Sequence, residues 1–278
     1  SRFHDTGITE QHAIGFCAGL AKAGLRPVAA IYSTFLQRGY DQVFQEVALQ
    51  NLPVVLALDR AGPVGQDGAT HNGVFDLAYL RTLPNMVIGS PRDATDTRRM
   101  LEGLVARDAP GAMRFPRANC PAQETLPEAE RRPMEPGKAE VLREGEPGGV
   151  AIWALGHLVS EALAAAEVMA KEGVQVAVID ARFVKPLDEE LLAAHLRAFR
   201  NVITIEAHQR MGGFGSAVLE VASRLPEGDG LARVRILGLP DRYLDHATTP
   251  EEQLRQVGLD GAGLVRQVRA LLGGSRVK

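Results

Sequence analysis

Apolar and polar positions alternate in blocks along the first half of the chain. Four short apolar runs predict buried strands at residues 27–32, 53–58, 86–89 and 112–115. The segments around them repeat their apolar residues at helical spacing and predict helices at residues 8–22, 35–51, 75–83 and 93–106. Strands that alternate with helices favour a mostly parallel sheet covered by helices on both faces.

The alternation stops at residues 117–148 and then resumes. Five prolines and clustered charges interrupt this segment, which predicts a surface linker. Beyond it we predict strands at residues 150–155, 174–179, 202–205 and 234–237, and helices at residues 159–171, 189–197, 215–225, 250–256 and 261–271. The predicted fold class is α/β with two doubly wound, mostly parallel sheets. The first domain would span residues 1–120, the linker residues 121–148 and the second domain residues 149–278.

Composition narrows the class of protein. A chain of 278 residues that is 45% hydrophobic and 23% charged can form two globular domains with buried cores. Its net charge of −3 does not favour nucleic-acid binding, and no apolar run reaches the roughly 18 residues of a membrane span. Cys17 and Cys120 stand alone, as expected for free thiols in a cytoplasmic protein. The chain starts at Ser1 without a targeting segment, so we expect it to begin inside a longer polypeptide.

A polar loop at residues 59–73 is the first candidate site. It follows the apolar strand at residues 53–58 and carries four glycines together with Arg60, Asp67 and His71. Open α/β sheets bind ligands at the carboxyl ends of their strands, where this loop is expected to lie. Arg117 follows the last strand of the same domain, so Arg60 and Arg117 could together hold a phosphate. Alternatively, the segment around Arg117 is a strand end held by salt bridges.

Two other segments of the first domain allow both a structural and a functional interpretation. Glu10 opens a helix that is otherwise mostly apolar. It is either a first-turn acid favoured by the helix dipole or a buried carboxyl that shares a proton with a ligand nitrogen. Tyr32, Phe35 and Arg38 span a strand end and a helix start. They form either an ordinary capped helix start or an aromatic platform with Arg38 facing the polar loop.

The glycine-rich stretch Met-Gly-Gly-Phe-Gly-Ser at residues 211–216 suggests a dinucleotide site only weakly. It lacks the Gly-x-Gly-x-x-Gly spacing after the first strand of a βαβ unit, and no acidic residue follows at the expected distance. We predict instead a helix start that packs closely against a neighbouring surface. The sequence contains no zinc, calcium or P-loop pattern, so no metal ligand is assigned.

Taken together, several stretches resemble the 1-deoxy-D-xylulose-5-phosphate synthases, over nearly the whole chain and in the same order. The loop that contains both Arg60 and His71 separates this family from transketolases and 2-oxo acid dehydrogenase β subunits, which are similar only in outline. Thr9 and Asn72 depart from the residues usual at their positions. The stretches that carry the resemblance are residues 8–13, 31–38, 59–62, 67–71, 114–117, 182–187, 211–216 and 238–241.

The resemblance implies a thiamine-diphosphate enzyme with a transketolase-like fold. The chain would contain most of the pyrimidine-binding domain, without its first strand and helix, and all of the C-terminal domain. The domain that binds the diphosphate and Mg²⁺ would be absent, so the chain alone would be inactive. The implied reaction condenses pyruvate with D-glyceraldehyde 3-phosphate and releases CO₂. Its product, 1-deoxy-D-xylulose 5-phosphate, feeds isoprenoid, thiamine and pyridoxal biosynthesis. A cytoplasmic homodimer is implied as well.

The resemblance also implies roles for individual residues. Glu10 would be catalytic, because it would hydrogen-bond the aminopyrimidine of the cofactor and favour its imino form, and Phe35 would stack on the same ring. Arg60 and Arg117 would bind the substrate phosphate. The substrate pocket would also be lined by Tyr32, Arg38, Asp67 and His71. Of these, His71 would also be catalytic. Two alternatives remain, a transketolase or 2-oxo acid dehydrogenase β-type subunit and a non-catalytic dimerisation or ligand-binding module.

Overall fold

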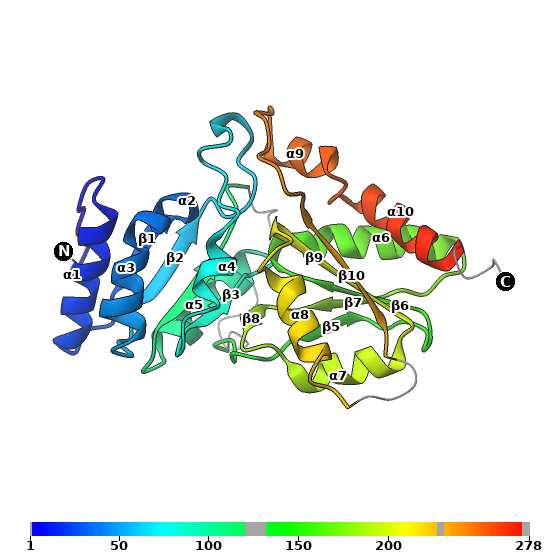
Figure 1. Cartoon of the computed structure of the whole chain (residues 1–278), viewed down its shortest axis with the longest axis horizontal. Helices are drawn as coiled ribbons and strands as arrows, with labels where there is room; N and C mark the ends of the chain where they lie inside the picture. The colour runs from blue at the N-terminus through cyan, green and yellow to red at the C-terminus, as the bar shows by residue number, and fades with distance from the viewer. Residues whose placement is uncertain (1, 120–131, 227–230, 274–278) are drawn as a thin grey trace.

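The computed structural model describes residues 2–119, 132–226 and 231–273, and contains two five-stranded sheets. In Figure 1 the N-terminal half lies on the left and the C-terminal half on the right. The first sheet has the order β1-β2-β4-β3-β8, parallel except for the pairing of β8 with β3. Its strands are β1 (Val28–Tyr32), β2 (Val55–Asp59), β3 (Val87–Gly89), β4 (Gly111–Arg114) and β8 (Phe183–Lys185).

The longer helices of the first half lie within the ranges that the apolar repeat predicts, and one of these ranges is irregular. The predicted helix at residues 35–51 is a chain of short turns of different type rather than one regular helix. Gly39 lies within it, and a Cβ there would come 3.5 Å from the Glu10 carbonyl oxygen, so glycine permits the close approach to α1. The helical elements are α1 (Glu10–Lys22), α2 (Ser33–Leu36), η1 (Gln37–Gly39), α3 (Tyr40–Gln42), η2 (Val43–Ala48), η3 (Gly65–Asp67), α4 (Asp76–Leu80) and α5 (Ala94–Val105).

The second sheet has the order β10-β9-β6-β7-β5 and is parallel except for the pairing of β5 with β7. Figure 1 shows α6 and α10 on one of its faces and α7 and α8 on the other. Its strands are β5 (Glu140–Arg143), β6 (Val150–Ala154), β7 (Ala177–Asp180), β9 (Asn201–Gln209) and β10 (Arg233–Leu239). The helical elements are η5 (Gly156–Leu158), α6 (Val159–Lys171), α7 (Glu189–Ala198), α8 (Phe214–Ala222), α9 (Pro250–Gln256) and α10 (Gly261–Gly273).

Side chains of the central strand β6 alternate between two cores, as the pleat of a strand requires. Ile152 packs into the cluster that contains α6 and α10, whereas Trp153 packs into the cluster that contains α7 and α8. The cluster that holds Trp153 also contains Ile14 of α1 and Leu56 of β2. The two halves of the molecule therefore share one hydrophobic core.

Two short edge strands depart from the predicted pattern. β5 lies inside the segment predicted to be a linker, and β8 leaves the second half of the chain to complete the first sheet. β5 and β8 have only four and three residues, which is too short to produce a recognisable period. β9 is longer than predicted and continues to Gln209. Residues 120–131 of the predicted linker, including Cys120, lie outside the described part.

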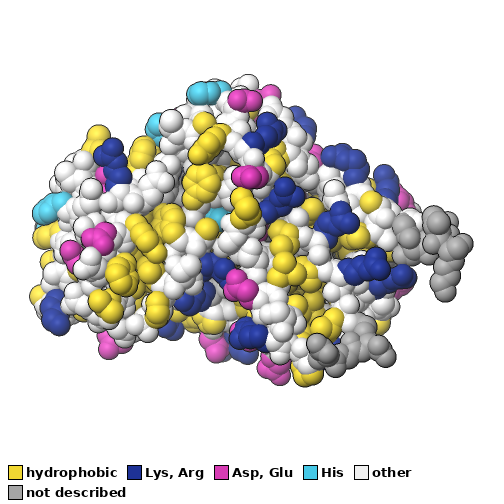
Figure 2. Space-filling view, in the orientation of Figure 1, with side chains coloured by type: hydrophobic (Ala, Val, Ile, Leu, Met, Phe, Trp, Pro, Cys, Tyr) yellow, Lys and Arg dark blue, Asp and Glu magenta, His cyan; other side chains and the backbone are white. Residues whose placement is uncertain are grey.

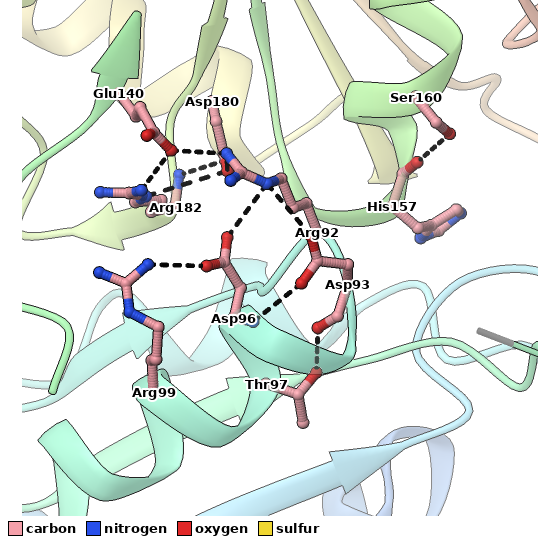
Figure 3. A network of polar contacts seen from close by, with 10 residues as sticks. All are labelled: Arg92, Asp93, Asp96, Thr97, Arg99, Glu140, His157, Ser160, Asp180 and Arg182. Atoms are coloured by element: carbon pink, nitrogen blue, oxygen red, sulfur yellow. Dashed lines mark hydrogen bonds and ion pairs between the residues drawn. The ribbon is translucent and has the colours of Figure 1, made fainter. Parts of the chain in front are cut away.

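A network of charges also joins the two halves (Figure 3). Arg92, which follows β3, places its Nη1 2.6 Å from Glu140 of β5 and 3.2 Å from Asp180 of β7. Its Nε lies 3.3 Å from Asp96 of α5, and Arg182 pairs with Glu140. With Asp93, which lies 3.3 Å from the same Nε, four carboxylates surround Arg92, two from each half of the chain.

Composition also predicts free cysteines and no membrane span. Cys17 is a free thiol buried in α1, and burial raises the pKa of this thiol. Among the described residues, no helix has the length and apolar character needed to cross a membrane.

Candidate active site

The candidate site lies at the carboxyl ends of three neighbouring strands. The strand register pairs Tyr32, the last residue of β1, with Asp59, the last residue of β2, and pairs Leu58 with Arg114 at the end of β4. The loop of residues 59–73 and the segment that leads to Arg117 therefore start from the same edge of the sheet. Backbone hydrogen bonds continue the pairing of these two segments beyond the strands, from Phe115 N to Leu58 O and from Ala61 N to Phe115 O.

Glu10 is a buried carboxyl group at the start of α1. Its side chain is 9% exposed, and its Oε2 atom is buried without a hydrogen-bond partner. It lines a cavity of about 490 Å³. The other residues that line this cavity come from the segment before α1, from α1 itself, from β1 and from the first helical turns after β1: Thr6, Gly7, Ile8, Ala13, Ala30, Ile31, Tyr32, Phe35 and Arg38. The cavity thus contains four of the predicted site residues, Glu10, Tyr32, Phe35 and Arg38.

A series of ring contacts connects the cavity to the polar loop. The rings of Tyr32 and Phe35 stack with centroids 5.4 Å apart, and His71 meets Phe35 edge-on at 5.3 Å. The Arg60 guanidinium lies 3.8 Å from the centre of the Tyr32 ring. Thr70 holds the His71 ring through a 2.9 Å contact between its Oγ1 and His71 Nδ1. These contacts bring Arg60 and His71 beside the residues of the cavity.

Arg60 has a backbone conformation that is rare for a residue with a side chain. Its φ of 58° lies in the left-handed region, which costs about 1–3 kcal/mol for residues other than glycine. The Asp59 carboxylate compensates part of this cost, because it accepts a 2.6 Å hydrogen bond from the Arg60 backbone N–H and pairs with the guanidinium. The arginine is thereby turned toward Tyr32.

Asp67 and Arg117 form a separate ion pair at the outer side of the loop. Arg117 Nη1 lies 2.6 Å from Asp67 Oδ2, and the two side chains are 48% and 30% exposed. An exposed pair of this kind contributes at most about 1 kcal/mol, so an anionic ligand can replace the carboxylate. Both arginines predicted to bind phosphate thus have carboxylate partners, Asp59 and Asp67, in the absence of ligand.

Three residues that the sequence analysis did not assign hold the loop in shape. Asn72 Oδ1 accepts a 3.0 Å hydrogen bond from Val64 N, and Gln253 Oε1 accepts one of 2.7 Å from Gly65 N. Arg114 donates to the carbonyl oxygens of Gly73 and Ala207. In the sequence, Asn72 departs from the residue usual at its position and Arg114 lies in the predicted strand at residues 112–115, but neither pattern indicates this role. Gln253 gave no signal, because nothing in a short polar helix indicates a distant loop.

A buried polar cluster lies behind the loop, where β9 meets the first half. Arg114 Nε is 2.8 Å from Asp76, and His208 Nε2 is 3.8 Å from the same carboxylate. Asp76 and His208 are almost completely buried. Burial, followed by the positive charge of Arg114, lowers the pKa of His208 to about 4, although Asp76 acts in the opposite direction. His208 is therefore neutral near pH 7.

The glycine-rich stretch at residues 211–216 has a structural explanation. Glu206 of β9 is fully buried and accepts hydrogen bonds from the backbone N–H groups of Phe214 and Gly215, at 2.6 and 2.8 Å. Burial raises the pKa of Glu206 to about 8, even though these N–H groups favour the charged form. A Cβ on Gly213 would overlap the Glu206 carboxylate. Close packing at the start of α8 thus accounts for the glycines, as the sequence analysis predicted.

The side chains that line the cavity suit an aromatic nitrogen heterocycle better than a metal ion. Glu10 offers an unpaired carboxyl oxygen that can share a proton with a ring nitrogen, and Phe35 contributes an aromatic wall. In the described ranges, which omit residues 1, 120–131, 227–230 and 274–278, no group of three or more His, Cys, Asp or Glu residues could hold a metal ion.

Comparison with known proteins identifies the family. The profile of the transketolase pyrimidine-binding domain matches residues 1–123, and that of the transketolase C-terminal domain matches residues 137–264. A solved structure described as a split-gene transketolase, inactive β4 tetramer, is 34% identical with a TM-score of 0.84. This match covers 97% of our chain and 84% of that one. The chain belongs to the transketolase family. The predicted transketolase-like α/β fold is thereby confirmed.

Within the transketolase family, the chain is similar to 1-deoxy-D-xylulose-5-phosphate synthases, so the predicted resemblance is also confirmed. It is 51% identical over 274 residues to synthase 1 of Geobacter sulfurreducens and 50% identical over 277 residues to the synthase of Aquifex aeolicus. The matches cover 98% and 99% of this chain but 41% and 42% of the relatives. The chain therefore spans about two-fifths of the length of the curated relatives it matches.

Proposed function

We propose that this chain forms the aminopyrimidine-binding and phosphate-binding half of a 1-deoxy-D-xylulose-5-phosphate synthase. The reaction joins pyruvate to D-glyceraldehyde 3-phosphate and releases CO₂. The observation that carries the proposal is the juxtaposition, at one sheet edge, of an unpaired buried carboxyl group with an arginine-bearing loop. Glu10 and Phe35 line the cavity, and Arg60 and His71 adjoin it through Tyr32 and Phe35. The similarity to proteins named as this synthase supports the choice of reaction.

Glu10 is the residue to which we assign cofactor activation. Thiamine diphosphate, when bound, would supply the nucleophilic carbon and the electron sink for decarboxylation. Glu10 would share a proton with a ring nitrogen of the aminopyrimidine, because its buried Oε2 has no other partner. Phe35 would pack against the ring and keep water away from the carboxyl group. His71, held by Thr70, would move a proton at the reacting oxygen of the substrate.

Arg60 and Arg117 are the residues to which we assign the phosphate of glyceraldehyde 3-phosphate. A phosphate dianion binds guanidinium groups more strongly than one carboxylate does, because it offers more acceptor oxygens and more charge. It would therefore compete with Asp59 and Asp67 for the two arginines. Tyr32, Arg38 and Asp67 would line the remaining pocket.

The rest of the catalytic centre would come from outside this chain. The remaining length of the relatives would supply the residues that hold the diphosphate and Mg²⁺. We expect another protein surface to cover the N-terminal half, since seven of the twelve exposed large hydrophobic residues of the described chain lie within its first 49 residues. Figure 2 shows hydrophobic side chains on this half, whereas Lys and Arg gather over the C-terminal half in the same view. We propose a cytoplasmic homodimer of the longer polypeptide.

A substrate comparison tests the proposed reaction. The purified longer enzyme, with thiamine diphosphate and Mg²⁺, should convert pyruvate and glyceraldehyde 3-phosphate to 1-deoxy-D-xylulose 5-phosphate. It should not transfer a ketol group from xylulose 5-phosphate to ribose 5-phosphate. Transketolase activity is the second candidate, favoured by the 34% identity to a split-gene transketolase. Ketol transfer without condensation would establish that alternative, and loss of both reactions would favour a non-catalytic module.

The role of Glu10 can be tested independently of the substrates. We expect Glu10→Gln to slow hydrogen–deuterium exchange at C2 of bound thiamine diphosphate by about 10²- to 10⁴-fold, the usual contribution of a positioned acid–base group. Glu102→Gln, on the exposed side of α5, is the matched control and should leave exchange unchanged. Rapid exchange in the Glu10 variant would refute its assignment.

A further inference from the structure

One residue of the C-terminal half makes a direct hydrogen bond to the polar loop of residues 59–73. Gln253 lies in α9, and its side chain is fully buried although it is polar. Its Oε1 accepts the Gly65 backbone N–H at 2.7 Å, and its Nε2 donates to the Asp245 carbonyl oxygen at 2.6 Å. The single amide therefore ties the loop to the segment before α9, and each end of the amide has one partner.

Further contacts fit the loop against the same segment, residues 245–250. Ala247 N donates to Gly65 O at 3.3 Å. A Cβ on Gly65 would lie 2.8 Å from the Thr249 carbonyl carbon, and one on Gly68 would overlap the His246 ring. Both glycines also have positive φ angles. The backbone of the loop is thus fixed on both sides of Asp67, and Figure 1 shows this loop next to α9 at the top of the molecule.

The local sequence explains why α9 presents Gln253 in a fixed position. The Thr249 hydroxyl accepts a hydrogen bond from Glu252 N at 3.2 Å, and Pro250 occupies the first turn, where its missing N–H does no harm. The Glu252 carboxylate accepts a hydrogen bond from Thr248 N at 2.8 Å. These caps set the start of a helix of only seven residues, so that its fourth residue faces the loop.

We propose that Gln253 is a positioning residue for substrate binding, acting from the C-terminal half on the loop that binds the substrate phosphate. By fixing Gly65, it sets the position of Asp67, which holds Arg117 at the loop until the substrate phosphate replaces the carboxylate. This inference rests on the proposed function for the identity of the substrate. It adds that the C-terminal half takes part in phosphate recognition through the loop, rather than serving only as a scaffold.

The test uses three variants and two measurements. Gln253→Met keeps the size of the side chain but removes both hydrogen bonds. Gln253→Glu keeps the acceptor for Gly65 N–H and can donate to Asp245 only when the carboxyl is protonated. Gln267→Met is the matched control on α10, where the side chain accepts an exposed hydrogen bond from Arg235 at 3.4 Å. Hydrogen–deuterium exchange of the Gly65 amide is measured in this chain, and steady-state kinetics in the longer enzyme.

In Gln253→Met we expect Gly65 exchange at least about tenfold faster. We also expect a KM for glyceraldehyde 3-phosphate raised about 3- to 10-fold, the usual effect of one lost hydrogen bond, with kcat and the KM for pyruvate unchanged. In Gln253→Glu, the KM should stay closer to the wild-type value than that of the methionine variant does, since the carboxyl group still accepts the Gly65 N–H bond. Gln267→Met should match the wild type throughout.

Other outcomes overturn the inference. Unchanged Gly65 exchange would show that the amide does not hold the loop. Faster exchange with equal losses for both substrates would reduce Gln253 to a structural residue. If the wild-type enzyme fails to condense pyruvate with glyceraldehyde 3-phosphate, the proposed function fails. The exchange experiment then still decides whether Gln253 fixes the loop.

Discussion

At the scale of single residues, the candidate site contains two arginines whose partners in this structure are carboxylates. Arg60 is held by Asp59 and stacked on Tyr32, and Arg117 is held by Asp67. The two arginines differ in exposure, because the Arg117 side chain is 48% exposed and that of Arg60 is 22% exposed. Arg60 is therefore the more enclosed of the two arginines, whereas Arg117 can exchange its carboxylate partner for another anion.

This difference leads to a prediction for Arg117. Because its ion pair is exposed, Arg117→Ala should leave the stability of the protein nearly unchanged. It should raise the KM for glyceraldehyde 3-phosphate about 10- to 100-fold, since one charge-assisted hydrogen bond to the phosphate is lost. Arg98→Ala, on the exposed face of α5, serves as the control. Steady-state kinetics with each substrate varied in turn measure the effect, and an equal rise for pyruvate would contradict a phosphate role.

At the scale of secondary structure, the sequence predicted elements whose burial follows a clear period. The run at residues 53–58 became β2, which is buried on both faces, whereas the run at residues 27–32 became the edge strand β1, which is buried only at alternate residues. β5 and β8 could not be predicted, because an edge strand of three or four residues depends on its partner strand rather than on its own pattern. The irregular helix after β1 depends on contact with α1, which a local sequence pattern does not contain.

The candidate site was predictable to the extent that its residues follow strand ends. Tyr32, Arg60 and Arg117 each lie just at or after the end of a strand, so a parallel sheet brings them to one edge. The contact between Gln253 and the loop spans 188 positions and depends on how the two halves pack. Tertiary contacts of this kind leave no local signal in one sequence.

Two glycines in helices lead to opposite predictions for stability. A Cβ on Gly215 in α8 would lie 2.5 Å from Ile236 Cγ2 and 2.8 Å from Thr204 Oγ1, so Gly215→Ala should destabilise the protein by about 1–3 kcal/mol. A Cβ on Gly19 in α1 would meet nothing within 4 Å, so Gly19→Ala should stabilise it by about 0.5–1 kcal/mol. Urea unfolding of both variants measures this difference. The same sign for both would show that local packing does not decide the effect.

At the scale of the whole molecule, the two halves behave as one unit because both a hydrophobic cluster and a charge network cross between them. Arg92 is the centre of that network (Figure 3), and its partners Asp96 and Asp180 are 1% and 0% exposed. Arg92→Met would leave these buried carboxylates with less compensation and should destabilise the protein by about 3–5 kcal/mol. Urea unfolding followed by fluorescence of Trp153 in the shared core would record the loss.

Arg224→Met provides the matched control for Arg92. It removes an ion pair with Glu189 whose two side chains are 62% and 54% exposed, so the loss should stay within about 1 kcal/mol. Equal destabilisation by both variants would mean that the network does not depend on burial. A second, separate unfolding transition in Arg92→Met would show in addition that the network couples the two halves.

His208, in the buried cluster between the two halves, should make the free energy of unfolding depend on pH. The pKa of His208 is about 4 in the folded protein, compared with 6.5 for an unperturbed histidine. Between these values the unfolded chain binds a proton that the folded protein does not, so the contribution of His208 to the free energy of unfolding is lost as the pH falls from 6.5 to 4. Such a shift corresponds to at most about 3 kcal/mol for one group. Burial, together with Arg114, also lowers the pKa of His157 to about 4, so the two histidines act in the same direction.

Replacing His208 should therefore remove part of this dependence on pH. His208→Gln keeps an acceptor for the Ala78 backbone N–H but cannot bind a proton in this range. We expect it to be less stable than the wild type near about pH 7.5, with the difference shrinking toward about pH 4.5 as the wild type loses the contribution of His208. His157 remains, so its own contribution to the acid slope should persist. His12→Gln, on the exposed side of α1, should retain the full slope. If wild type and His208→Gln lost stability in parallel on acidification, then protonation of His208 would not be what loosens the contact between the two halves.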